Sequence, residues 1–440
     1  MKHHFTILFS GLVVMLVMAA CGGATPATTE PPAATAVATA AATAAPTEAA
    51  PEVVTLKLGF TASQTGAQNV ASTGQLNGIN LWLDAVNKDG IKVGDKIVKF
   101  ETVTYDDEST TDRVQQLYTK LATEDKVDLM ISPYSSGLAD AAAVISEQYG
   151  KIMVTTGAAS EGTYKKGYTH VFQAYTPASN YLTPAIDLLA KLDPTVKKIA
   201  IVHENDKFSS DVAKAAEAYA KDKGYDIVMS EGYDTGTTDF SPFINKIQAA
   251  APDAIIGGGH FADGSTFAKQ LAEKKVAVKF VALLVAPPEP KFGDLGDAAL
   301  GVVGPSQWEP GVTYSADAAK AMNIPWYGPT VQEFTDAYKA KYNADPSYHG
   351  AGGYAAGLLL QKALEDAGST DAEALKAALD KLDILTFFGH LKFNTTAEAH
   401  GLQTGHTMVL MQWQKEGDKL VKKTIWPEDA ATGTALYPKP

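Results

Sequence analysis

Short runs of apolar, β-branched residues alternate with amphipathic segments along most of this chain, from Val53 onwards. Residues 54–60 have the composition of a strand, whereas apolar residues recur at helical spacing in 75–86. The pattern predicts strands at 54–60, 97–104, 129–131 and 152–155, and helices at 75–86, 111–123 and 139–149. Strands that alternate with helices form a parallel sheet with helices on both faces. The first part of the chain is therefore predicted to be an α/β lobe.

A second series of the same kind begins after Thr176-Pro177. It comprises predicted helices at 177–192, 210–223, 240–249 and 265–271, and predicted strands at 198–203, 226–230, 254–256 and 280–285. Helices then follow at 330–342, 353–367 and 372–381, before strands at 389–393 and 408–413. This late return to strands predicts that the chain crosses between two lobes three times.

We place the three crossings near 175–178, 303–308 and 386–390. The predicted domain boundaries follow from them. They assign 53–175 and 307–387 to the first lobe, 176–306 and 388–426 to the second lobe, and 427–440 to a C-terminal tail.

The N-terminus has a basic start, an apolar run over 5–17 and a small-residue step that ends in Cys21, the only cysteine. The run is shorter than the roughly 20 residues of a membrane span, and is typical of a signal peptide over 1–20. The step resembles the bacterial lipobox, although Met18 stands where that pattern usually has Leu. The resemblance implies that Cys21 is lipidated and that the folded body is extracytoplasmic, anchored to the cell membrane. An ordinary secretory signal with an incidental Cys is the alternative.

Residues 21–52 are almost entirely Ala, Thr and Pro after the cysteine. They lack the large apolar side chains that a core requires, so we expect a disordered tether. An Ala-rich helical stalk is the alternative, but repeated Pro and Thr disfavour it.

Composition excludes several classes of function. A formal net charge of -13 argues against nucleic acid as a partner. A single Cys permits neither an internal disulfide nor a thiolate metal cluster, and the histidines lack zinc-site spacing. No nucleophile elbow or phosphate loop is present. We therefore expect no metal, no cofactor and no enzymatic activity. The adjacent Asp106 and Asp107 are interpreted as capping or hinge-side residues.

Two polar turns at neighbouring strand ends are the candidate binding site. Residues 131–137 (Ile-Ser-Pro-Tyr-Ser-Ser-Gly) end one strand and open a helix, and 155–160 (Thr-Thr-Gly-Ala-Ala-Ser) follow the next strand. Free N–H groups at a helix N-terminus, with hydroxyls beside them, suit an anion. Backbone carbonyls of the same turns suit an ammonium group, so the pair could hold a small zwitterion. Helix capping by Ser is the alternative.

A series of short motifs then points to one family. They are Lys57-Leu58-Gly59-Phe60, Gln64-Thr65-Gly66, Asn77-Gly78, Tyr105-Asp106-Asp107, Pro133-Tyr134-Ser135-Ser136, Gly157-Ala158-Ala159-Ser160, 167–172 and 199–203. By their order and spacing, the chain from Val54 to about Trp413 resembles the leucine/isoleucine/valine-binding proteins of ABC importers. The resemblance implies a two-lobed type I periplasmic-binding-protein fold.

The resemblance also implies ligand-binding residues. Ser136, beside Tyr134, falls on the family's carboxylate-binding Ser, and Ala158 and Ser160 fall on the pair that holds the backbone of an amino acid. Aromatic positions of the second lobe correspond to Phe208 and His260. For His260, a surface loop histidine is the alternative.

Two departures from the family pattern weaken the case for leucine. The acid expected just after the strand at 280–285 is missing, and the nearest acid is Glu289. An aromatic expected before the first helix is replaced by Ala71. Trp308 and the adjacent Glu309 could supply a ring and an acid instead.

The resemblance thus implies a monomeric solute-binding protein that passes an amino acid, or a similar small polar solute, to an ABC permease. The cleft between the lobes would close on the ligand. A sensor that signals to a membrane receptor, a binder of amides or small carboxylates, and a hydrolase using Asp106 or His260 are the alternatives.

Overall fold

The computed structural model describes residues 51–440. The predicted signal peptide, Cys21 and nearly all of the tether lie outside these residues. The first strand begins at Glu52, the last residue of the predicted tether. Among the described helices, none is both long enough and apolar enough to serve as a membrane span.

The first lobe is built on a six-stranded sheet in the order β2-β3-β1-β4-β5-β6. Its strands are β1 (Glu52–Ala62), β2 (Ile91–Val93), β3 (Lys96–Asp106), β4 (Leu129–Ile131), β5 (Met153–Thr155) and β6 (Val171–Gln173). All neighbours are parallel except β2 and β3. The predicted parallel sheet is confirmed.

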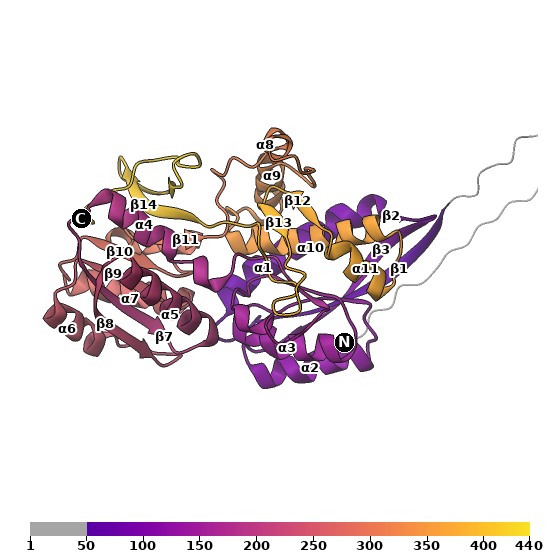
Figure 1. Ribbon diagram of the computed structural model, residues 1–440, viewed down its shortest axis with the longest axis horizontal. Coiled ribbons are helices and arrows are strands. Elements are labelled where there is room, and N and C mark those ends of the chain that lie inside the picture. Colours follow the sequence, from indigo (N-terminus) through magenta and orange to yellow (C-terminus); the bar gives the residue numbers. More distant parts are fainter. Residues whose placement is uncertain (1–50) are drawn as a thin grey trace, which may run out of the picture. The chain divides into compact units, whose positions relative to one another are not determined.

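Helices cover both faces of this sheet (Figure 1). The helices of this lobe are α1 (Asn69–Asp89), α2 (Thr111–Thr123) and α3 (Ser136–Gln148), joined later by α8 (Ala316–Ala321), α9 (Val331–Tyr342), α10 (Tyr348–Ala367) and α11 (Ala372–Leu379). Side chains of a strand alternate between faces, so Leu129 and Ile131 pack with α1 and α10 whereas Met130 packs with α2 and α3.

Helices α1 and α10 approach so closely that glycine is required between them. A Cβ atom on Gly78 would lie 1.9 Å from the carbonyl oxygen of Gly350, and one on Gly353 would lie 2.2 Å from the carbonyl oxygen of Gln75. Both distances are far below van der Waals contact. The small residues of α10 therefore set the spacing of the two helices.

The second lobe contains a seven-stranded sheet in the order β15-β14-β11-β10-β9-β7-β8. Its strands are β7 (Lys198–Glu204), β8 (Asp226–Tyr233), β9 (Ala254–Gly258), β10 (Phe280–Leu283), β11 (Val303–Ser306), β14 (Val409–Glu416) and β15 (Lys419–Trp426). β14 is antiparallel to both of its neighbours, β11 and β15, and all other neighbouring strands are parallel.

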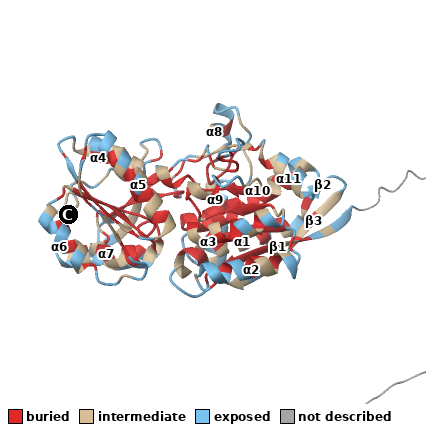
Figure 2. Cartoon of the chain, turned by 60° about the horizontal axis from the view of Figure 1, so that its bottom comes forward, coloured by how far each residue is buried: buried red, intermediate tan, exposed pale blue. Residues whose placement is uncertain are grey.

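Four helices flank this sheet: α4 (Thr183–Leu192), α5 (Lys207–Asp222), α6 (Ser241–Ala250) and α7 (Phe261–Glu273). Ile199 and Ile201 pack with α4 and α5, whereas Ala200 and Val202 face α6 and α7. Figure 2 shows buried strands in both lobes and exposed outer faces on the helices. Short 3-10 helices lie at η1 (Glu161–Thr163), η2 (Ala178–Asn180) and η3 (Pro290–Ala298).

A small antiparallel pair, β12 (Asp383–Leu385) and β13 (His390–Lys392), precedes β14. Leu391 and Phe393 belong to the core of the first lobe, and the chain joins the second sheet only at Val409. We therefore move the proposed third crossing from 386–390 to the residues just before β14.

The segments proposed as crossings are hydrogen-bonded to one another. The N–H of Thr176 donates to Gln307 Oε1 (2.9 Å), and the hydroxyl of Thr176 lies 2.7 Å from His406 Nδ1. His406 Nε2 lies 2.9 Å from the carbonyl oxygen of Phe388. These side chains are buried and join the three segments in one network.

Candidate ligand-binding site

The carboxyl ends of strands from both lobes face one small cavity. Residues of the first lobe that line it are Tyr134, Ser136, Gly157, Ala159, Tyr175, Tyr348 and His349, and those of the second are Tyr181, Phe208, His260 and Val285. Ligands of doubly wound sheets bind at this edge. The cavity has a volume of about 10 Å³, which holds about one water molecule.

Ser136 is the first residue of α3 and joins the two polar turns. Its Oγ accepts hydrogen bonds from the N–H groups of Ala159 (3.0 Å) and Ser160 (3.1 Å). A hydroxyl has two lone pairs and one proton, so Ser136 has only its O–H left to offer a ligand. The sequence-predicted proximity of Ser136 and Ser160 is confirmed.

The second turn is placed differently from what the resemblance implied. Ala159, not Ala158, lines the cavity, while the carbonyl oxygen of Ala158 accepts from Gln173 Nε2 (3.2 Å). The Ser160 hydroxyl donates to the carbonyl oxygen of Lys207 (3.4 Å), at the start of α5. Ala158 and Ser160 thus support the cavity wall from behind in this structure.

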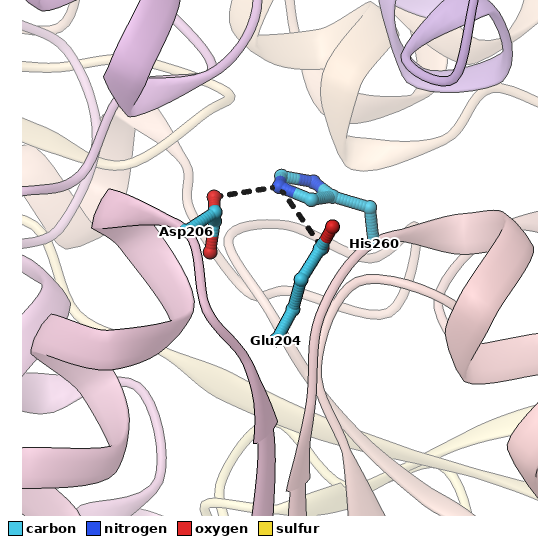
Figure 3. Close-up of side chains that lie close together, drawn as sticks. All are labelled: Glu204, Asp206 and His260. Carbon is cyan, nitrogen blue, oxygen red and sulfur yellow. Dashed lines mark hydrogen bonds and ion pairs between the residues drawn. The ribbon is translucent and has the colours of Figure 1, made fainter. Parts of the chain in front are cut away.

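Tyr134 and His260 meet across the cavity. The Tyr134 hydroxyl lies 2.9 Å from His260 Nδ1, and His260 Nε2 lies 3.0 Å from Asp206 Oδ2. His260 Nε2 also lies 4.0 Å from Glu204 Oε2. Figure 3 marks the contacts of His260 with both acids by dashed lines. Two of the residues predicted separately for the site are therefore brought together, and the alternative of a surface loop does not hold for His260, which is buried.

Charges around His260 favour its imidazolium form. Burial lowers the pKa of His260, but the carboxylates of Asp206 and Glu204 outweigh it and raise the pKa to about 9. A ring with both protons donates through Nε2 to Asp206 and through Nδ1 to the Tyr134 oxygen. Burial raises the pKa of the Glu204 carboxyl.

Glu289 lies behind His349 rather than in the cavity wall. Its Oε1 is 2.5 Å from His349 Nδ1, and both side chains are buried. His349 lines the cavity, and its Nε2 is buried with no hydrogen-bond partner among residues 51–440. This leaves one polar atom of the first lobe without a partner beside the site.

Trp308 and Glu309 do not reach the cavity in this structure. Trp308 is fully buried against Phe334 and Phe387, and its indole N–H donates to the carbonyl oxygen of Phe387. Glu309 pairs with Lys422 at 2.8 Å. The suggested replacement ring and acid are therefore part of the core packing.

The paired acids after β3 organise a turn. Asp107 accepts from the hydroxyls of Thr61 and Ser63, each at 2.6 Å, and Asp106 accepts from the N–H of Gln64. These contacts give the two acids a structural role in the turn, but neither is the N-cap of α2, which is Thr110.

Sequence analysis missed much of the aromatic wall. Tyr175 and Tyr181 flank the first crossing, and Tyr348 and His349 begin α10. Only the expectation that crossings border the cleft could have pointed to the two tyrosines. Val285 also lines the cavity, with a φ of 51° that is unfavourable for a β-branched residue.

Comparison with known proteins supports the same architecture. The periplasmic binding protein family matches residues 55–418. A Leu/Ile/Val-binding protein homolog of Brucella melitensis is 26% identical over 399 residues, which cover 89% of this chain and 96% of that protein.

Two solved structures share the fold. One is a branched-chain amino acid transporter substrate binding protein from Streptococcus pneumoniae in complex with isoleucine, with a TM-score of 0.68 and 22% identity over 85% of this chain and 100% of that one. The other is a solute binding protein of R. palustris in complex with 4-hydroxybenzoate, with a TM-score of 0.70 and 20% identity over 84% and 96% of the two chains. The predicted α/β architecture is confirmed, and this chain belongs to the periplasmic binding protein family.

Proposed function

We propose that this protein is the extracytoplasmic substrate-binding component of an ABC importer and binds a small organic carboxylate between its lobes. The observation that carries the proposal is the cavity itself, since the strand ends of both lobes line it. Relatives named as Leu/Ile/Val-binding protein homologs make an amino acid the first candidate ligand.

Ligand entry requires the lobes to separate. A cavity of about 10 Å³ cannot hold an amino acid, so side chains that now touch must move apart. The contacts to be broken include Tyr134 with His260, Ser160 with Lys207, and His349 with Glu289. A ligand that bridges both walls would favour the closed arrangement in proportion to its differential affinity for it.

Polar groups of the site suit a carboxylate. The Ser136 O–H can only donate, and it lies at the N-terminus of α3, where the helix dipole favours negative charge. The unpartnered Nε2 of His349 supplies a second polar contact. No Lys or Arg is among the described residues that line the cavity, and the imidazolium of His260 is already paired with Asp206, which favours a ligand with little net negative charge, such as a zwitterion.

Aromatic carboxylates are the second candidate. Tyr134, Tyr175, Tyr181, Phe208 and Tyr348 surround the cavity, and rings of this kind stack well against another ring. Structural relatives in complex with 4-hydroxybenzoate and benzoate have the same fold.

A ligand screen tests the proposal. Aliphatic amino acids, their amides, benzoate and hydroxybenzoates would be added to the protein in thermal unfolding, followed by calorimetry of any that raise the melting temperature. We expect one class to bind with one site per chain. If no member of either carboxylate class binds, the proposed ligand chemistry is wrong.

Ser136→Ala is expected to weaken binding of the identified ligand by about tenfold to one hundredfold, the loss of one hydrogen bond to a charged group. The change also removes the acceptor of two buried N–H groups, so a lower melting temperature is expected as well. Calorimetry at a temperature where the variant is fully folded measures the affinity.

Two variants act as controls for this result. Ser136→Thr keeps the hydroxyl and should retain most of the affinity. Ser241 occupies the same first position in α6 and is not among the residues that line the cavity, so Ser241→Ala should leave binding unchanged. Equal affinity of Ser136→Ala and the wild-type protein would refute the carboxylate role of Ser136.

We also propose that Cys21 carries a lipid anchor, as the lipobox resemblance implies. Cys21→Ser should move the protein from the membrane fraction to the soluble fraction of a bacterial host, because one thioether-linked lipid would be its only attachment. Fractionation followed by immunoblotting measures the change. A variant that stays in the membrane fraction would contradict lipidation.

A further inference from the structure

We propose that Glu204, Asp206 and His260 form a binding site for one divalent transition-metal cation, of the class of Zn²⁺, next to the ligand cavity. One donor atom from each residue lies within 4.8 Å of the others. Figure 3 shows the three side chains close together. His260 Nε2 is 3.0 Å from Asp206 Oδ2 and 4.0 Å from Glu204 Oε2. Donors bound to a common ion about 2.1 Å away are spaced about 3–4 Å apart, so small movements suffice.

The Glu204 carboxylate is the strongest evidence for a cation. Its Oε2 is buried without a hydrogen-bond partner among residues 51–440, and water does not replace that partner because the side chain is only 5% exposed. A buried carboxylate oxygen is unfavourable unless it is paired or coordinates a metal. Oε2 points to the donors of Asp206 and His260, so an ion held there would satisfy it.

The local charge also favours a cation. Glu204, Asp206 and Asp263 surround a single histidine, and a Cβ on Gly259 would lie 2.5 Å from both Glu204 Oε2 and Asp263 Oδ2. Three acids and one imidazole leave an excess of formal negative charge in a buried place. A divalent ion would offset two of the three negative charges, whereas a protonated histidine offsets only one.

Surrounding residues already hold the donors in place, as in metal sites where outer hydrogen bonds orient the ligands. Asp206 caps α5 by accepting through Oδ1 from the N–H of Ser209 at 2.7 Å, while its Oδ2 faces His260 Nε2. His260 Nδ1 contacts the Tyr134 hydroxyl, so the ion would take the place of the Nε2 proton that now lies between His260 and Asp206. Asp263 accepts from the N–H of His260 at 2.8 Å and from the Tyr233 hydroxyl, so both of its oxygens are used.

The position in the fold is a favourable one. Glu204 ends β7 and His260 follows β9, and the strand order reverses between these two neighbours. Sites of α/β sheets form at such a reversal. A second cavity, of about 100 Å³, is bordered by Glu204, His260 and Asp263 and has room for water molecules that would complete the coordination.

One imidazole nitrogen with two carboxylates favours Zn²⁺ and its transition-metal neighbours over Mg²⁺ and Ca²⁺, which prefer oxygen donors alone. Such an ion would also affect the ligand cavity. His260 lines that cavity and contacts Tyr134 of the first lobe, so the ion would fix the His260 ring at the point where the lobes meet.

Cobalt titration of the full-length, chelator-treated protein tests the site. Co²⁺ reports on its coordination through visible absorption bands, and Zn²⁺ would then be added to displace it. We expect the wild-type protein to bind one ion per chain at this site. Glu204→Gln should either bind one ion fewer per chain or bind that ion at least tenfold more weakly than the wild-type protein. The visible bands of this site should be lost in the variant.

Glu231→Gln is the matched control, because Glu231 is a half-buried acid of β8 that pairs with Lys246 away from the cluster. It should bind like the wild-type protein. His3, His4 and Cys21 are shared by all variants, so any ion they hold cancels in the comparison. If Glu204→Gln does not fold, Asp206→Asn takes its place. Equal stoichiometry and affinity in the wild-type protein and the folded variant would overturn the proposal.

Discussion

Gly78→Ala is expected to lower the free energy of unfolding by about 3 kcal/mol, at the upper end of what overpacking costs. The added Cβ would lie 1.9 Å from the carbonyl oxygen of Gly350 and 2.8 Å from the nitrogen of Tyr354. Both atoms belong to the main chain of α10, so no side-chain rotation relieves the clash. The two helices must separate, which opens the core between them.

The expected direction of this change distinguishes the steric clash from the effect of helix propensity. In a helix interior Ala is normally more favourable than Gly, by about 1 kcal/mol. Gly137 provides the control, because it lies in α3 and a Cβ on it would meet no atom within 4 Å. Denaturant unfolding followed by circular dichroism should show Gly137→Ala near or above wild-type stability. A Gly78→Ala protein as stable as Gly137→Ala would mean that α1 and α10 are not in such close contact.

Element prediction succeeded where local pattern and tertiary packing agree. The helix at Thr111–Thr123 and the strand at Leu129–Ile131 have the predicted bounds. The sequence pattern predicts helix α10 from 353, but the helix begins at Tyr348. The predicted start is too late because the first turns contain Gly350, Gly352 and Gly353. Glycine has a low helix propensity. Contact with α1 requires small residues there, and that requirement is not visible in a local window.

The short strands β2 and β12 are not predicted by the local pattern. Each has only three residues, too few for an alternating pattern to be recognised, although each pairs with the next strand in the chain. The strand-like residues 389–393 were assigned to the second lobe because no local signal distinguishes the cores. In the structure Leu391 and Phe393 pack in the first lobe.

The candidate site was predictable where a residue directly follows a strand. Tyr134, Ser136 and His260 lie just beyond β4 and β9, so topology places each of them at the carboxyl edge of its own sheet. His349 could not be found this way, since α10 places it there through packing over a long sequence separation. The cluster of Glu204, Asp206 and His260 has no local metal-site spacing, because its members follow different strands.

Stability is expected to fall on acidification because of His406. Burial lowers the pKa of His406 to about 4, as the ring lies in the network that joins the proposed crossings. An imidazole in the unfolded chain has a pKa of about 6.5. Between these two values the unfolded state binds more protons than the native state, so the free energy of unfolding decreases as pH falls.

The difference of about 2.5 pH units corresponds to about 3 kcal/mol, present above pH 6.5 and lost progressively towards pH 4. In the neutral ring Nε2–H donates to the carbonyl oxygen of Phe388, and Nδ1 accepts from the Thr176 hydroxyl. Protonation makes Nδ1 a donor and places a charge among buried groups.

His406→Gln removes this titration, so its free energy of unfolding should depend less on pH between 6.5 and 4, by about 3 kcal/mol. Denaturant unfolding at intervals across this range, with His203→Gln as the control for loss of a half-buried histidine, measures the slope. A slope in His406→Gln as steep as that of the wild-type protein would show that His406 is not held neutral at the crossings.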